Sequence, residues 1–141
     1  MLLPDAFLNF RLKNVYQGFA ICEGVLYLTK NAVVIEYFTK DSFFGLIKSN
    51  LKTVRLDFSE ILSVEVKKTF FSKKLIIKLK ALNKIIHTPF ESAKHSIFSE
   101  SNAIEIPLKR GKDVILKARS IASFINEQIM ENTLKNIENE L

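Results

Sequence analysis

The sequence is poor in the residue types that build most enzyme sites. It has one cysteine, which excludes an intrachain disulfide and makes a reducing, cytoplasmic location the simplest interpretation. It has no glycine-rich phosphate loop, no paired cysteines and no nucleophile motif of recognisable spacing. Cys22 stands in an apolar stretch, where a thiol is usually packed rather than reactive. We therefore expect no enzymatic activity, no catalytic residue and no cofactor.

Long apolar runs are also missing. No run approaches the ~18 apolar residues that a membrane-spanning helix needs. The first ten residues, MLLPDAFLNF, place a proline and an aspartate where a secretory signal would carry its hydrophobic segment. Any membrane contact is therefore expected to be peripheral, at the inner face of the membrane.

Histidine is scarce, and both histidines fall in one segment. His87, Glu91 and His95 are spaced i, i+4 and i+8, which would align them for a divalent metal if the segment were helical. A helix starting at Thr88 or Pro89 would leave His87 outside it. We therefore expect two solvated histidines in a loop and no metal site.

The charge is unevenly distributed along the 141 residues. The net charge is +6, but residues 127–141 carry four glutamates and one lysine, which is −4 + 1 = −3, so the remainder is +9. A basic body favours anionic partners such as lipid headgroups or nucleic acid, although basic surfaces often serve only solubility. Nucleic-acid modules expose aromatics among their cations. Most aromatics here are expected in the core, which argues against nucleic acid as a ligand. These aromatics are Phe19, Tyr27, Tyr37, Phe38 and Phe58.

Alternation of apolar and polar residues predicts an antiparallel β meander. The segments with this pattern are 15–22, 24–29, 32–38, 52–58, 61–68, 74–81 and 103–109. Glu23-Gly24 and Lys30-Asn31 are the turns expected after the first two. Residues 82–103 lose the periodicity and predict a long loop of open role. Residues 1–14 are expected to add a short helix, because Leu3, Phe7 and Phe10 would share one side of it.

The period becomes helical after Arg110-Gly111, with Asp113 near the helix start. One apolar stripe, expected to cover the sheets, comprises Val114, Ala118, Ile121, Ala122, Ile125 and Ile129. A second stripe falls on nearly the opposite side and comprises Met130, Leu134, Ile137 and Leu141. Either Asn132-Thr133 breaks the helix and the tail folds back, or an unbroken helix presents the second stripe to a partner. The second case predicts a homo-oligomer.

Three stretches resemble a known family. EGVLYLTKNAVVIEYF (23–38) resembles the first hairpin of GRAM and bacterial PH-like domains, in which a glycine opens a strand reading Leu-Tyr-Leu-Thr. FFG (43–45) and TVRLDFSEILSVEV (53–66) resemble the loop and the strand-turn-strand that follow in that family. The resemblance implies a mainly β fold with a C-terminal α-helix, a pleckstrin-homology-like, partly open barrel of about seven antiparallel strands capped by one helix. The corresponding organisation is an extension over 1–14, a PH-like domain over 15–129 and a helical tail over 130–141.

The stretch KKTFFSKK (67–74) combines two adjacent phenylalanines with paired lysines. If Val66 faces Leu75, the apolar faces of 61–68 and 74–81 align, Val64 faces Ile77 and Leu62 faces Leu79. Like charges then oppose each other across the ladder, Lys67 against Lys74 and Lys68 against Lys73. A four-residue turn over Thr69–Ser72 is expected, because Phe70-Phe71 suits neither two-residue hairpin turn.

Two interpretations of this tip stay open. Phe70 and Phe71 either fold back over the sheet rim while the lysines extend into water, or they contact an anionic membrane surface. The sequence therefore predicts a non-enzymatic adaptor that docks weakly on an anionic membrane or a protein partner. The alternative is a self-association module that uses the C-terminal helix and has no lipid role.

Overall fold

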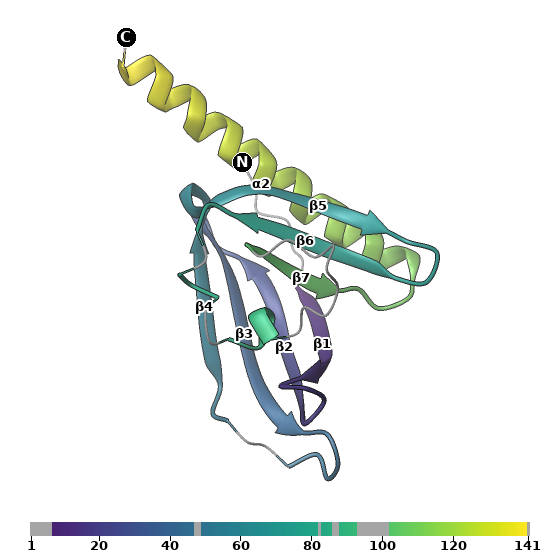
Figure 1. The fold of residues 1–141 in the computed structure, drawn as a ribbon. Coiled ribbons are helices and arrows are strands. Elements are labelled where there is room, and N and C mark those ends of the chain that lie inside the picture. Colours follow the sequence, from purple (N-terminus) through teal and green to yellow (C-terminus); the bar gives the residue numbers. More distant parts are fainter. Residues whose placement is uncertain (1–6, 47–48, 82, 86–87, 93–101, 141) are drawn as a thin grey trace.

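The computed structural model describes residues 7–46, 49–81, 83–85, 88–92 and 102–140. These residues form two antiparallel sheets and a long C-terminal helix (Figure 1). The first sheet has the order β1-β2-β3-β4 and comprises β1 (Leu8–Val15), β2 (Ala20–Leu28), β3 (Ala32–Asp41) and β4 (Lys52–Asp57). The second has the order β5-β6-β7 and comprises β5 (Ile61–Lys68), β6 (Lys73–Leu79) and β7 (Ala103–Pro107). The helices are α1 (Pro89–Ser92) and α2 (Lys112–Glu140), and the two sheets are not closed into a barrel.

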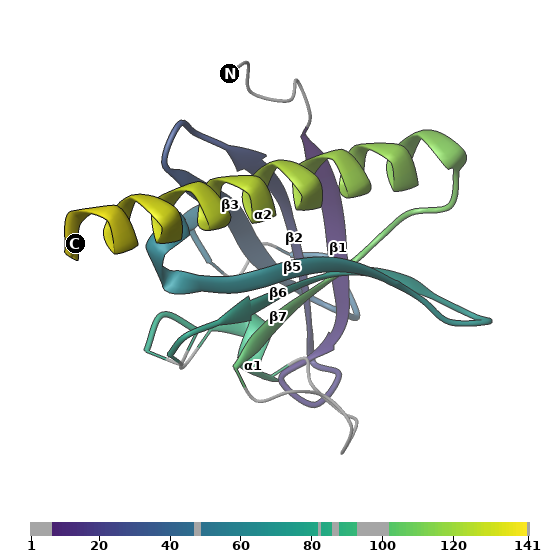
Figure 2. The same ribbon diagram turned by 90° about the horizontal axis from the view of Figure 1, so that it is seen from above.

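The core lies between the inner faces of the two sheets and the first half of α2, which packs along β5 and crosses above β1, β2 and β3 (Figure 2). The helix buries Ile115, Ala118, Ile121, Ala122, Phe124 and Ile125. The expected stripe is thus confirmed at Ala118, Ile121, Ala122 and Ile125, whereas Val114 and Ile129 are partly buried at its margins.

The helix expected within residues 1–14 is wrong for the described part, because residues 8–15 form β1. Leu8, Phe10 and Leu12 alternate onto the core face, and this period of two satisfies the backbone through pairing with β2. The domain accordingly begins before residue 15. Residues 1–6, which include Leu3, lie outside the described residues.

The turn expected at Glu23-Gly24 is also wrong, since β2 runs unbroken from Ala20 to Leu28. Gly24 pairs with Phe10 on one side and with Tyr37 on the other. A Cβ at Gly24 would meet the Glu36 carbonyl oxygen and the Phe10 ring. Gly24 therefore allows close packing beneath the Phe10 ring. In place of the two short strands expected over 15–22 and 24–29, the chain has the turn that follows β1 and then the single strand β2.

The expected register of the β5–β6 hairpin is confirmed except at one end. Val66 pairs with Leu75 and Val64 with Ile77, but Leu79 pairs with Ile61 instead of Leu62. The register shifts between Ile61 and Ser63, and this irregularity turns Leu62 outward, where its side chain is exposed.

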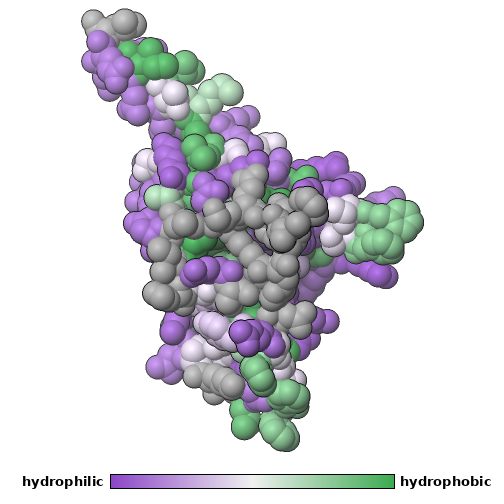
Figure 3. Space-filling view, viewed as in Figure 1, coloured by the Kyte–Doolittle hydropathy of each residue, from purple (hydrophilic) through white to green (hydrophobic). Residues whose placement is uncertain are grey.

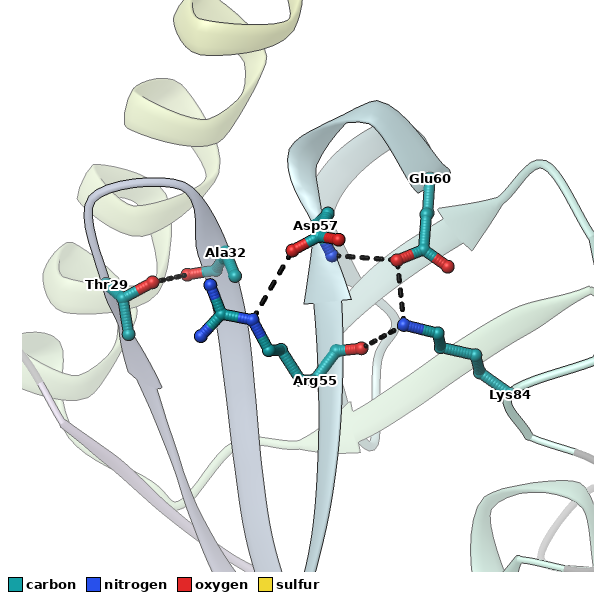
Figure 4. Close-up of polar contacts among 6 residues, drawn as sticks. All are labelled: Thr29, Ala32, Arg55, Asp57, Glu60 and Lys84. Atoms are coloured by element: carbon teal, nitrogen blue, oxygen red, sulfur yellow. Dashed lines mark hydrogen bonds and ion pairs between the residues drawn. The ribbon is translucent and has the colours of Figure 1, made fainter.

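A polar cluster fixes the corner at which the chain passes from β4 to β5 (Figure 4). The Asp57 amide donates to Glu60 Oε1 at 3.1 Å in a one-turn helix over Phe58–Glu60. Lys84 Nζ bridges the Arg55 carbonyl and Glu60 Oε1, both at 2.8 Å. Lys84 thereby ties the segment after β6 to the edge of β4 and lowers the pKa of the Glu60 carboxyl, chiefly by its hydrogen bond.

Part of the expected long loop belongs to the core. Ile85 and Phe90 are buried, and the Phe90 ring lies 5.3 Å from Tyr37 and 5.9 Å from Phe10 between ring centroids. The metal hypothesis at His87, Glu91 and His95 cannot be placed, because both histidines lie outside the described residues.

Candidate docking surface

The β5–β6 turn projects from the body, and its two phenylalanines lie in solvent. The Thr69 amide donates to the Ser72 carbonyl at 2.7 Å, and the Ser72 amide donates to Thr69 Oγ1 at 3.0 Å, which confirms the four-residue turn. Phe70 is 94% exposed and Phe71 is 91% exposed. Their rings contact each other edge to face, with centroids 4.9 Å apart. The interpretation in which they fold back over the sheet rim is therefore wrong.

Four lysines stand directly behind the two rings. Lys67 pairs with Lys74 and Lys68 with Lys73 across the ladder, as expected. Lys67, Lys68 and Lys73 are exposed, and Lys74 approaches Glu105 Oε1 at 3.7 Å. Like charges opposed on a ladder destabilise it, so folding alone does not account for these lysines. We call Lys67–Lys74 the tip.

A groove beside the tip adds further cations. It has a volume of about 530 Å³ and lies between the turn and the segment that leads from β7 into α2. The Leu108 amide donates to the Lys73 carbonyl at 2.9 Å and holds this segment against the hairpin. Lys109 and Arg110 line the groove together with Lys73 and Lys74. Figure 3 shows the tip as an apolar projection at the right of the molecule, with hydrophilic surface behind it.

A second exposed phenylalanine pair lies in the β3–β4 connection. The Asp41 carboxylate accepts hydrogen bonds from the amides of Phe43, Phe44 and Leu46 at 2.7–3.0 Å and shapes this loop. The Phe43 ring lies 6.5 Å from that of Phe19. The described part of this loop is therefore built around a carboxylate, whereas the tip carries four lysines beside its two phenylalanines.

Phe19 was expected in the core and is instead exposed. The backbone adopts positive φ angles at Tyr16 (52°) and Gln17 (61°), which end β1 and place Phe19 in the turn before β2. Tyr37 and Phe58 are buried as expected, and Tyr27 and Phe38 are partly buried. The sequence pattern alone did not identify the turn before β2, because Tyr16 and Phe19 are aromatic residues of the kind that also occur in strands.

The C-terminal half of α2 forms a second candidate surface. The helix continues through Asn132-Thr133, so the break considered at this dipeptide is wrong. Met130 is 65% exposed, Leu134 53% and Ile137 49%. Leu141, the last member of the stripe, lies outside the described residues. Figure 1 shows this half of the helix extending beyond both sheets. We call residues 127–140 the tail, in place of the range 130–141 expected from the sequence.

Two further reactive side chains among the described residues, Cys22 and Glu23, are buried or paired within the chain. Cys22 is fully buried, and burial raises the pKa of its thiol to about 12, in agreement with the expected packed cysteine. Glu23 contacts Lys40 Nζ at 2.8 Å and Arg11 Nε at 3.3 Å, and the Lys40 hydrogen bond lowers the pKa of its carboxyl. Across the described ranges, no three metal-ligating side chains gather at one point.

The described helices include none that is both long enough and apolar enough to cross a membrane. Comparison of the chain with protein-family models, with curated proteins and with solved structures found no significant match.

Proposed function

We propose that this chain is a non-enzymatic PH-like adaptor whose tip docks reversibly on an anionic membrane surface. The single observation that carries the proposal is the position of Phe70 and Phe71, which are almost fully exposed on a turn backed by four lysines. The strand order, the open arrangement of the two sheets and the C-terminal helix support the PH-like assignment.

The energetics favour a weak and reversible contact. Each lysine close to an anionic surface contributes about 1 kcal/mol, which gives about 4 kcal/mol for the four lysines. Partial burial of each phenylalanine contributes up to about 1.5–3 kcal/mol. The gross gain of roughly 7–10 kcal/mol is of the same order as the cost of association and side-chain ordering. Docking should therefore require both the rings and the charges.

The hydrogen-bonded turn supports the proposed insertion of the tip. Hydrogen bonds between Thr69 and Ser72 fix the turn, so two rings enter the membrane interface with little loss of backbone freedom. Lysine side chains can extend toward headgroups while their methylene stems stay beside the rings. A bilayer thereby relieves both the exposure of the rings and the opposition of the lysines.

The proposal is tested by co-sedimentation with vesicles of phosphatidylcholine containing about 30% phosphatidylserine, at low and high salt. We expect wild-type protein to bind these vesicles at low salt, to lose binding as salt rises, and to ignore pure phosphatidylcholine. The double substitution Phe70→Ser and Phe71→Ser should reduce binding about tenfold or more, because it removes most of the apolar contribution.

The chain itself offers the matched control. Phe43→Ser with Phe44→Ser removes a second exposed phenylalanine pair without changing the tip. We expect this control to bind like wild type. Wild-type protein that ignores anionic vesicles at low salt, or a control that loses as much binding as the tip variant, would contradict docking through the tip.

Self-association through α2 is the second candidate function. The observation that favours it is the unbroken helix, which leaves Met130, Leu134 and Ile137 in solvent on one side. Truncation after Ile129 should then leave a folded monomer, measured by light scattering, since none of the described residues that it removes belongs to the buried core. A full-length chain that is already monomeric at high concentration would contradict this candidate.

A further inference from the structure

The tail combines an apolar stripe with negative charge. At 100° per residue, Met130, Leu134 and Ile137 lie within about 60° of one another around the helix axis. Glu127, Glu131 and Glu138 follow one margin of this stripe and Glu140 the other, with Lys135 as the one cation of residues 127–140. All residues from Met130 to Glu140 are exposed. The tail is therefore an acidic, amphipathic helix with its apolar side uncovered.

Pairing of two tails is unfavourable on charge grounds. The tail carries −4 + 1 = −3, so a tail–tail pair would bring two segments of −3 together. Like charges along a helix pair weaken it and help to select a different partner. The complementary partner is an apolar surface framed by cations.

The tip has this complementary character. Phe70 and Phe71 supply the apolar contact, and Lys67, Lys68 and Lys73 stand exposed behind them. The spacing also fits, because Met130 and Ile137 lie seven residues apart, about 10 Å along the helix axis. Two rings with centroids 4.9 Å apart can lie on such a stripe while the lysines reach its acidic margin.

One chain cannot make this contact with itself. Lys109 and Arg110 line the groove beside the tip and are separated from α2 only by Gly111, so the tip lies near the N-terminal end of the helix. The tail is the opposite end of 29 helical residues, a length of about 44 Å. Figures 1 and 2 both place the β5–β6 turn and the C-terminus on opposite sides of the molecule.

We infer that the tail docks on the tip of a second copy of this chain, in a head-to-tail contact between copies. The contact uses two different surfaces, so a pair keeps a free tip on one copy and a free tail on the other, and assembly can continue into short oligomers or a closed ring. It is small compared with a standard interface of about 1,600 Å², and it is expected to be weak and sensitive to salt.

The contact goes beyond membrane docking but shares the tip with it. A bilayer and a neighbouring tail cannot cover Phe70 and Phe71 at the same time, so anionic vesicles should disassemble the head-to-tail oligomers. Loss of the tail should leave membrane docking intact, which separates the two proposals experimentally.

A mixing experiment tests the inference. The tip variant carries Phe70→Ser and Phe71→Ser, and the tail variant carries Leu134→Gln and Ile137→Gln, all at exposed positions. Light scattering at low salt should show wild-type mass rising above 16.2 kDa with concentration, while each variant alone stays at 16.2 kDa. An equimolar mixture should form a pair of about twice that mass and no larger species, because one intact tip and one intact tail remain.

Other outcomes overturn the inference in recognisable ways. A tip variant that self-associates like wild type would indicate tail–tail pairing, and a mixture that stays monomeric would exclude a contact between tip and tail. If the tail variant binds anionic vesicles like wild type but the mixture stays monomeric, the contact between tip and tail is wrong and the proposed membrane function is unaffected.

A charge exchange gives a second, independent test. Glu131→Lys with Glu138→Lys in the tail should abolish assembly, and so should Lys68→Glu with Lys73→Glu in the tip. Combining all four substitutions in one chain should restore assembly, since the tail lysines of one copy then face the tip glutamates of the next. Absence of restoration, with the fourfold variant folded by circular dichroism, would contradict the assigned contact.

Discussion

The Asn126 side chain occupies the position of a neighbouring strand beside Val64. Its Oδ1 accepts from the Val64 amide at 3.0 Å and its Nδ2 donates to the Val64 carbonyl at 2.8 Å. Val64 lies on β5, the edge strand of the second sheet, whose outer backbone groups would otherwise be open to pairing with another chain. One helical amide thus fastens α2 to the sheet and blocks part of this edge.

Asn126→Ala should destabilise the fold by about 1–3 kcal/mol, because two backbone groups lose their partner. Asn132→Ala is the matched control, since Asn132 is exposed on the same helix and the change in helix propensity is the same. Thermal unfolding should show a decrease of several degrees for Asn126→Ala relative to Asn132→Ala. Equal melting temperatures would mean that the paired hydrogen bonds contribute nothing measurable.

Gly24→Ala should cost about 1–3 kcal/mol in urea unfolding, although alanine is ordinarily tolerated in a strand. The cause is steric, because the new methyl group would meet the Glu36 carbonyl oxygen and the Phe10 ring. Adding Phe10→Leu should recover only part of the loss, since the backbone oxygen stays in place. A neutral Gly24→Ala substitution would contradict the close approach of β2 to these groups.

The Cys22 thiol should be unreactive toward Ellman's reagent in the folded protein. Burial excludes the reagent and raises the thiol pKa to about 12, so almost no thiolate is present at neutral pH. Reaction should become rapid in denaturant. Phe71→Cys provides the comparison, since it places a thiol on the exposed tip and should react at once. Fast reaction of Cys22 in native buffer would show that the strand is accessible.

The Lys84–Glu60 contact should make stability sensitive to acid. The folded-state pKa of Glu60 lies below its ordinary value of 4.5, so its contribution is fully present above that value and is lost as pH falls through the lowered pKa. Both groups are partly exposed, so the effect should be a fraction of a kcal/mol, about that of a surface ion pair. Lys84→Met should flatten the acid limb of a plot of stability against pH. An unchanged acid limb would assign the pH dependence to other carboxyls.

Much of the β architecture follows from local sequence pattern. Alternation over 61–68 and 74–81 predicts the pairing of Val66 with Leu75 and of Lys67 with Lys74, because a shift of one residue would turn every apolar side chain outward. Helical periodicity after Gly111 predicts the first residue of α2 to within one position. These features depend on spacing along one or two adjacent segments, which a sequence displays directly.

Tertiary contacts decided the remainder. Whether Glu23-Gly24 is a turn or part of β2 depends on Phe10, which lies fourteen residues earlier and covers the glycine. Ile61 replaces Leu62 in the core because the ladder shifts register there, and Asn126 reveals its role only when α2 lies beside β5. For Phe70 and Phe71, composition is compatible with either burial or exposure. The β5–β6 hairpin carries the turn beyond the body, where no part of the described fold covers the two rings, so the position of the turn sets their exposure.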